Sequence, residues 1–304
     1  MSDSQLTLEQ LLAAGVHFGH QTRRWNPKMR RFIFAERNGI HIIDLQKTMR
    51  QLELAQKLAR DVVLRGEHVL FVCTKPQLAA LVKEAAEKCG GLYITERWLG
   101  GLLTNFQTVK KQLRRMKELE EGSESGGEFE NYTKKEQLMM ARERDKLSKY
   151  LGGIKGMSRL PGLMFVIDSK KERIAVSEAN KLGIPIVAVV DTNADPDLIT
   201  VPIAGNDDAI RSVELIANAI AGTIAEARRE TPVRAEAEEG ESYTYSSDRG
   251  AEPAEGESER KRKRRPRRRR AKPEAIAARL KPAGEGEGGE GGATDDGGGD
   301  AASE

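Results

Sequence analysis

Short and continuously apolar segments alternate with amphipathic segments over residues 68–230 of the chain. An apolar run without polar alternation is typical of a strand that is buried on both faces of a parallel sheet. Amphipathic helices between such strands supply the crossover connections that parallel pairing requires. The pattern therefore predicts an α/β fold with a doubly wound parallel sheet. The predicted strands are His68–Val72, Leu92–Thr95, Leu163–Ile167 and Pro185–Val190, and the predicted helices are Gln77–Lys88, Lys171–Leu182 and Asp208–Arg229.

The segment before this alternation contains a helix start, a hairpin signal and a second helix start. Thr7 can cap a short helix, and Gly15 can end it in the left-handed conformation that glycine tolerates. Asn38-Gly39 separates the apolar runs 31–35 and 40–44, and this dipeptide is the strongest short signal for a β-hairpin. Asp44 then caps a predicted helix that extends to about residue 64.

The stretch from residue 105 to residue 150 contains no strand-like run and predicts two helices. Phe106, Val109, Leu113 and Met116 recur every three or four residues, as in the seam of a coiled coil. A second helical segment covers 133–150, and the Gly-, Ser- and Glu-rich residues 121–131 predict a turn between the two. We therefore expect an α/β core domain over 1–104 and 151–230, with an α-helical coiled-coil hairpin inserted at 105–150.

The composition changes sharply after Glu230 to Glu, Gly, Ala, Ser and Arg, with few large apolar side chains. Such a segment buries too little apolar surface to offset its ordering entropy, so residues 231–304 are predicted to be a disordered tail. Every residue of the block 260–272 except Pro266 and Ala271 is basic. A run of like charge of this kind interacts with polyanions if it interacts with anything.

Cys73 and Cys89 are the only cysteines, and they are not in a C-x-x-C arrangement. A disulfide framework and a zinc ribbon are therefore excluded, and a reducing cytosol fits this usage. The first ten residues lack the basic and apolar regions of a signal peptide, and the longest apolar run, around Pro185, is too short for a membrane span. We expect a soluble, cytoplasmic protein without a membrane contact.

An enzyme is one hypothesis for this chain, because this fold class hosts many nucleotide-dependent enzymes. The first predicted turn from strand to helix reads Cys73-Thr-Lys-Pro-Gln, without the glycines of a dinucleotide fingerprint, and the chain contains no P-loop. Gly152-Gly-Ile-Lys-Gly156 follows a predicted helix instead of a strand, which disfavours phosphate binding. Asp168 ends a strand, where a loop anchor or helix cap is the commoner role. These signals disfavour an enzyme.

Two groups of residues are candidates for a metal site. The segment starting at Asp191 resembles a calcium loop, but Pro196 and Pro202 replace the glycine and glutamate that an EF-hand needs. Asp191, Asp207 and Asp208 remain weak candidates for a structural magnesium ion, with cap and turn roles favoured for all three. His17 and His20 lie three residues apart without a third nitrogen or sulfur ligand nearby in sequence, so zinc is disfavoured.

The segment from His17 to Arg31 has the better case for a ligand, namely nucleic acid. Its five cations, Arg23, Arg24, Lys28, Arg30 and Arg31, occur without a carboxylate, so their fields add. Phe18 and Trp25 interleave with them and could stack on unpaired bases, while guanidinium groups bind phosphate oxygens in pairs. The alternative is a solvated loop with Trp25 packed into the core. Charge alone leaves the two interpretations about even.

The predicted hairpin carries a second set of cations on both arms. A projecting charged hairpin can simply be solvated or pair its own ions, and the three glutamates within residues 118–121 dilute the basic field near its tip. The base of the hairpin is therefore the expected contact region, with Lys110, Lys111 and Arg114 as its candidate RNA-binding residues.

Seven segments, in this order, resemble the universal small-subunit ribosomal protein two family in its bacterial and organellar form. Seven collinear motifs over about residues 1–228 make the resemblance very specific, although no single motif would. The segments are Leu12-Ala-Ala-Gly-Val-His-Phe-Gly-His20, Trp25-Asn-Pro-Lys-Met, Ile40-His-Ile-Ile-Asp-Leu-Gln-Lys-Thr48, Arg97-Trp-Leu-Gly-Gly-Leu-Leu-Thr-Asn105, Glu178-Ala-Asn-Lys-Leu-Gly-Ile-Pro185, Asp191-Thr-Asn-Ala-Asp-Pro196 and Gly205-Asn-Asp-Asp-Ala209.

The resemblance implies a flavodoxin-like sheet of five strands and a structural role in the small ribosomal subunit. It also implies contacts with small-subunit rRNA and other small-subunit proteins, help in recruiting the mRNA-binding ribosomal protein one, and a cytoplasmic, ribosome-bound location. It implies neither an enzyme activity nor a small-molecule substrate. By position, Arg23, Arg24, Trp25, Lys28, Arg30 and Arg31 match the basic loop of the family, and Arg97–Asn105 match its signature turn.

Two features depart from the family pattern. Cys73 stands where glycine is usual before Thr-Lys, so a positive φ at this position would be strained. The tail after Glu230 is longer and more basic than the common pattern. A nucleotide-dependent enzyme or switch that acquired a hairpin is the alternative, and calorimetry with nucleotides and magnesium discriminates it from a ribosomal protein.

Overall fold

The computed structural model describes residues 6–123 and 132–230. The predicted tail 231–304, with its basic block 260–272, lies outside the described residues, as does most of the predicted turn at 121–131. No helix in the described part of the chain has the length and hydropathy needed to cross a membrane.

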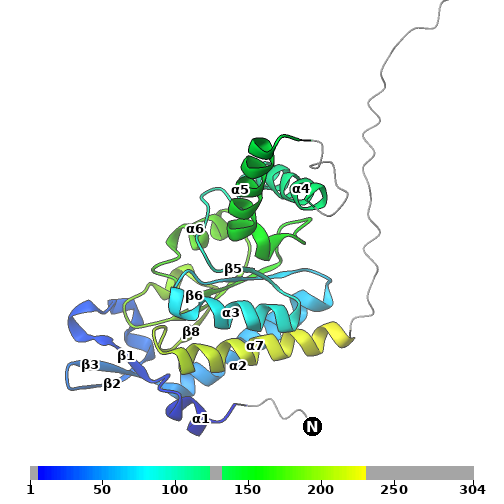
Figure 1. Ribbon diagram of the computed structural model, residues 1–304. Helices are drawn as coiled ribbons and strands as arrows, with labels where there is room; N and C mark the ends of the chain where they lie inside the picture. The colour runs from blue at the N-terminus through cyan, green and yellow to red at the C-terminus, as the bar shows by residue number, and fades with distance from the viewer. Residues whose placement is uncertain (1–5, 124–131, 231–304) are drawn as a thin grey trace, which may run out of the picture. The chain divides into compact units, whose positions relative to one another are not determined.

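A parallel sheet of five strands forms the centre of the α/β domain (Figure 1). Its spatial order is β5-β4-β6-β7-β8. Counted along the chain within this sheet, that is the order 2-1-3-4-5 of a flavodoxin-like fold, with the switch point between β4 and β6. The doubly wound prediction is confirmed. The strands are β4 (Val69–Val72), β5 (Leu92–Ile94), β6 (Leu163–Ile167), β7 (Ile186–Val190) and β8 (Val201–Ala204).

The pattern of apolar runs did not predict β8. This strand is short and contains Pro202, which cannot donate a backbone hydrogen bond to a neighbouring strand. β8 pairs only with β7 and forms one edge of the sheet. Proline is tolerated in edge strands of a sheet. Pro202 therefore fits its position in β8, although it removed the strand signal from the sequence.

Alternate side chains of each strand enter two separate cores. On one face Phe71 and Phe165 pack edge to face, with ring centroids 5.4 Å apart, under α2 (Leu45–Leu64), α3 (Pro76–Cys89) and α7 (Ile210–Glu230). On the other face Leu70 and Met164 pack against α6 (Arg173–Leu182) and the start of α4 (Phe106–Gly122). Both faces of the sheet are therefore covered, which explains why its strands have no polar alternation.

A small antiparallel sheet precedes this domain. Its order is β1-β3-β2, with β1 (Phe18–Gln21), β2 (Ile33–Arg37) and β3 (Ile40–Ile43). β2 and β3 form the predicted Asn-Gly hairpin, in which Asn38 has a φ of 53° and Gly39 a φ of 72°. β1 was not predicted, because its four residues lie within the segment interpreted as a basic loop.

The predicted caps of the first two helices are confirmed. At the start of α1 (Leu8–Ala13) the Thr7 side chain accepts a hydrogen bond from the Gln10 backbone N–H. The Gln10 side chain accepts in return from the Thr7 backbone N–H, which completes a capping box. Asp44 accepts from the backbone N–H of Gln46 at the start of α2. Gly15, just after α1, has the expected positive φ of 75°. These local signals needed no tertiary contact to be predicted correctly.

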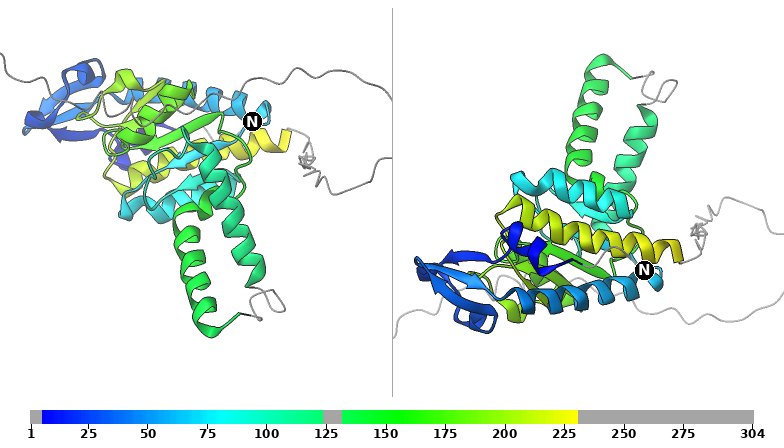
Figure 2. Two further views of the ribbon diagram at one scale, coloured as in Figure 1. Left: turned by 90° about the horizontal axis from the view of Figure 1, so that it is seen from above. Right: turned by 90° about the horizontal axis from the view of Figure 1, so that it is seen from below.

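Two helices, α4 and α5 (Lys134–Leu151), form the inserted hairpin and lie side by side in both views of Figure 2. On α4, Val109, Leu113 and Met116 are buried, as the seam pattern predicts. On α5, however, Leu138 and Met139 are more than half exposed. A continuous coiled-coil seam between the arms therefore stays a prediction.

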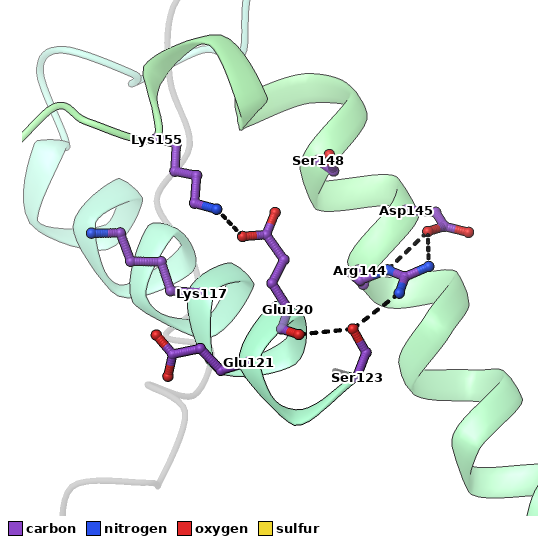
Figure 3. Close-up of a pocket in the computed structure, with 8 residues that line it drawn as sticks. All are labelled: Lys117, Glu120, Glu121, Ser123, Arg144, Asp145, Ser148 and Lys155. Atoms are coloured by element: carbon purple, nitrogen blue, oxygen red, sulfur yellow. Dashed lines mark hydrogen bonds and ion pairs between the residues drawn. The ribbon is translucent and has the colours of Figure 1, made fainter. Parts of the chain in front are cut away.

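A polar cleft of about 640 Å³ lies between the two helices toward the end of α4 (Figure 3). Among the residues that line this cleft, Lys155 forms an ion pair with Glu120, and Arg144 donates a hydrogen bond of 3.1 Å to the Ser123 hydroxyl. These polar contacts join the end of α4 to α5 and to the segment that follows it. The cleft is lined by Lys117, Glu120, Glu121, Ser123, Arg144, Asp145, Ser148 and Lys155.

The unusual Cys73 is accommodated without backbone strain. Among the described residues the only positive φ values outside glycine belong to Asn38 and Asp168, so Cys73 does not adopt the left-handed conformation. Its side chain is fully buried in the core beneath α3, and burial raises the pKa of its thiol to about 11. Cys73 is therefore an apolar core residue here.

Candidate nucleic-acid interface

The predicted basic loop is held in place by its backbone. It contains the 3₁₀ turns Thr22–Arg24 and Pro27–Phe32. Between them the Asn26 N–H donates to the Thr192 carbonyl at 2.7 Å, and the Asn26 side chain accepts from the Lys28 N–H at 3.0 Å. Met29 and Phe32 are buried in the second core. The loop thus has a defined conformation from which its exposed cations project.

The structure divides the five cations of the loop into two groups. Lys28 lies 2.7 Å from Asp195 and 3.1 Å from Asp197, and Arg31 lies 3.3 Å from Asp197. Hydrogen bonding to these carboxylates raises the pKa of Lys28. These two cations are therefore already partnered by acidic residues that sequence order places more than 160 positions away.

The other group consists of Arg23, Arg24 and Arg30, whose side chains are exposed. None of the three forms an ion pair with a carboxylate in residues 6–123 or 132–230. Arg23 donates only to the neutral Gln21 side chain, at 3.2 Å. Uncompensated guanidinium groups on an ordered loop are suited to bind phosphate oxygens.

Trp25 differs from the exposed base-stacking residue that was predicted as one possibility. Its side chain is half-buried, and its ring packs against the buried His41 ring with centroids 5.1 Å apart. Trp25 is a member of neither hydrophobic core, so both interpretations, base stacking and packing into the core, stay predictions. Phe18 remains exposed on β1.

The remaining predicted RNA-binding residues belong to a different part of the domain. Arg97 is exposed in the turn before α4, and Lys110, Lys111 and Arg114 follow on that helix. Lys110 is half-buried, and the other two are exposed. Within the described ranges none of these four forms an ion pair. Figure 2 shows that the basic loop and the hairpin leave the α/β domain at separate places.

A lysine and three carboxylates meet at the carboxyl ends of the parallel strands. The Lys75 ammonium group follows β4 and lies 2.8 Å from Asp168, 2.9 Å from Asp207 and 2.8 Å from Asp208. Burial alone would lower the pKa of Lys75, but the three carboxylates raise it. Asp168 also accepts from the Lys171 N–H, which confirms its predicted role as a loop anchor.

Asp207 is the most deeply buried member of this cluster, at 1% exposure. Burial, together with the neighbouring Asp168 and Asp191, raises its pKa to about 7 despite Lys75. Its Oδ2 atom is buried without a hydrogen-bond partner in the described residues. A buried oxygen of this kind is an available ligand atom.

The possible metal site differs from the predicted set. Ligand atoms of His20, Asp191 and Asp207 lie within 4.8 Å of one another, whereas Asp208 is exposed and bonds to Lys75. His20 Nδ1 is 2.8 Å from Asp191, and this hydrogen bond raises the pKa of the imidazole. The sequence alone does not connect His20 with the aspartates, because they are 171 positions or more apart.

Comparison with known proteins identifies the family. Residues 11–227 match the family described as ribosomal protein S2. Over 221 residues the chain is 57% identical to the small ribosomal subunit protein uS2 of Acidothermus cellulolyticus. The aligned region covers 73% of this chain and 80% of that protein. The protein of the same name from Syntrophobacter fumaroxidans is 54% identical over 239 residues, which cover 79% of this chain and 87% of that protein. The chain belongs to the ribosomal protein S2 family.

Membership of the S2 family confirms the resemblance found in the sequence motifs. The chain is a structural constituent of the small ribosomal subunit, bound to the ribosome in the cytoplasm, and it is not an enzyme. The alternative of a nucleotide-dependent enzyme is therefore wrong. The S2 match ends at residue 227, before the acidic and basic tail begins.

Proposed function

We propose that the chain binds small-subunit rRNA mainly through phosphate contacts of its basic loop, with Arg23, Arg24 and Arg30 as the principal groups. The observation that carries this proposal is the division of the loop cations, because only these three lack an acidic partner in the described ranges. Lys28 and Arg31 instead hold the loop against Asp195 and Asp197. Phosphate contacts of this kind position a protein on RNA without reading its sequence.

Replacing Arg23, Arg24 and Arg30 together by Ala is expected to weaken binding to small subunits that lack this protein. If each arginine neutralises one phosphate, the slope of log affinity against log salt concentration should become shallower by about 2 to 3 units. Filter binding or sedimentation over a range of salt concentrations measures this slope.

The matched control removes Arg50, Lys57 and Lys170, three exposed cations outside the loop. It changes net charge equally and should leave the slope nearly unchanged. An equal loss of slope in both variants would show that only net charge matters, and this result would contradict the role of the loop.

The hairpin cations Lys110, Lys111 and Arg114, with Arg97, are proposed as a second rRNA contact. The block 260–272 of the tail is proposed as a further electrostatic anchor, supported by its run of basic residues. Both proposals rest on the electrostatic attraction between cations and the phosphate backbone.

We further propose that the small antiparallel sheet contributes to recruitment of ribosomal protein one. Phe34 on β2 is 77% exposed and Phe18 on β1 is 48% exposed. Phenylalanine is among the aromatic residues that are enriched in protein–protein interfaces. The sheet therefore offers apolar anchors that the α/β core does not need.

Replacing Phe34 by Ser is expected to lower the affinity of reconstituted small subunits for ribosomal protein one about tenfold, corresponding to about 1.4 kcal/mol. Quantitative co-sedimentation measures this change. Leu54→Ser on α2 is the control, because Leu54 is 49% exposed but lies outside the small sheet. Equal binding by the Phe34 variant and the wild type would exclude this anchor.

Besides these macromolecular partners, we propose that the chain binds a divalent metal ion through His20, Asp191 and Asp207. The buried, unpartnered Oδ2 of Asp207 supports it. The aspartates alone would suit magnesium, which prefers oxygen ligands. An imidazole nitrogen among the ligands favours zinc over magnesium, because magnesium prefers oxygen ligands.

A further inference from the structure

The turn at residues 97–105, which leads from β5 into α4, folds around one buried carboxylate. Glu178 belongs to α6 and is 6% exposed. Its Oε1 accepts hydrogen bonds from the Trp98 indole at 3.1 Å and the Gly101 N–H at 2.7 Å. Its Oε2 accepts from the N–H groups of Leu103 and Thr104 at 3.1 and 3.2 Å, and from the Thr104 hydroxyl at 3.2 Å.

Glu178 has no cationic partner in the described ranges, so the donors of the turn alone balance its charge. Burial by itself would raise the pKa of this carboxyl, but the hydrogen bonds from the turn hold it below the ordinary value. All five donors belong to residues 98–104. The carboxylate thus specifies the conformation of the turn, since a turn of another shape would leave it buried and unpaired.

Backbone hydrogen bonds connect the turn to the first helix of the hairpin. Gly101 adopts a φ of 85°, and its carbonyl accepts from the Asn105 N–H at 2.7 Å. The Asn105 carbonyl accepts in turn from the N–H groups of Thr108 and Val109 in the first turn of α4. Hydrogen bonds therefore connect Glu178, through the turn, to the first turn of α4.

We propose that Glu178 is a positioning residue for RNA binding, which holds the turn 97–105 so that Arg97 and the cations of α4 are presented together in one fixed orientation. The inference rests on the proposed rRNA contact of the hairpin. Glu178 itself touches no RNA in this scheme and acts only through the turn.

The first test measures the orientation of the hairpin in the free, full-length protein. Spin labels at Glu53→Cys on α2 and Gln112→Cys on α4 are on exposed positions, and the native Cys73 and Cys89 are buried. Double electron–electron resonance then reports the distance distribution between the labels. Glu178→Gln is expected to broaden this distribution, because its amide places a donor group against N–H donors of the turn.

The second test measures binding of the same variants to small subunits that lack this protein. If the native orientation is populated about a tenth of the time in Glu178→Gln, the apparent dissociation constant should rise about tenfold. Glu178→Asp keeps both oxygens and should restore part of the affinity. If Glu178→Gln does not fold, Glu178→Asp is compared with the wild type instead.

Glu172→Gln is the matched control, because Glu172 is also buried and adjoins the same helix but accepts hydrogen bonds from Thr74 instead of the turn. It should leave the distance distribution unchanged.

An unchanged distribution in both Glu178 variants would overturn the positioning role, whatever happens to RNA binding. A broadened distribution with wild-type binding would overturn the link to RNA. Arg97→Ala removes one proposed rRNA contact and leaves Glu178 intact. Comparison of this variant with the Glu178 variants therefore distinguishes a failure of the proposed rRNA contact from a failure of positioning.

Discussion

Replacing Lys75 by Met is expected to lower the free energy of unfolding by about 3–5 kcal/mol, the usual result of removing one partner from a buried ion pair. Lys75 and Asp168 are each 14% exposed, and Asp207 is 1% exposed. Without the ammonium group, these carboxylates and Asp208 would face one another across a poorly solvated space. Equilibrium urea unfolding of the variant and the wild type measures the difference.

The loss should be largest above pH 7. Because the pKa of Asp207 is raised to about 7, its carboxyl is ionised in the folded protein only above that pH, and there it depends most on Lys75. Lys83→Met on α3 is the control, since Lys83 is 52% exposed and lies 3.9 Å from Glu87. An exposed pair of this kind contributes at most about 1 kcal/mol. Equal losses in the two variants would show that the Lys75 cluster behaves like a surface ion pair.

Zinc is expected to stabilise the protein through His20, Asp191 and Asp207. A metal that binds only the folded state at 100 times its dissociation constant raises the free energy of unfolding by about 2.7 kcal/mol. Urea unfolding with and without zinc measures this increase, and addition of a chelator should reverse it. Magnesium should give a smaller increase, because it gains little from the imidazole ligand.

His20→Ala should remove the stabilisation by zinc, since it leaves only the two aspartates of the set. His17→Ala is the control, because His17 lies nearby in sequence but outside the group of ligand atoms within 4.8 Å. Zinc stabilisation that survives in the His20 variant, or that His17→Ala removes equally, would exclude this site.

Local sequence signals predicted most of the fold. β6 was predicted with its observed bounds, because five consecutive buried residues form an apolar run with clear ends. Asp44 marked the start of α2 through its capping role, which depends only on neighbouring residues. β8 escaped prediction because Pro202 disguises an edge strand.

The candidate sites were harder to predict, because their geometry depends on contacts between distant segments. The charge pattern grouped Lys28 and Arg31 with the three free arginines, and only the folded chain places Asp195 and Asp197 beside them. Glu178 lies in a recognised motif, yet no local pattern connects it to the turn 97–105. Motif order identified the family, while the distribution of unpaired charge required the structure.

Lys75 occupies the place where this fold class usually binds a small ligand. In open α/β sheets a small ligand usually occupies the crevice beyond the carboxyl ends of the strands, near the switch point. Here a lysine and three aspartates of the chain itself meet at those strand ends. Two of the segments with proposed RNA contacts, the basic loop and the hairpin, are additions outside the five-stranded framework. In the proposed function, the five-stranded framework positions these added segments, and the contacts with RNA are made by the additions.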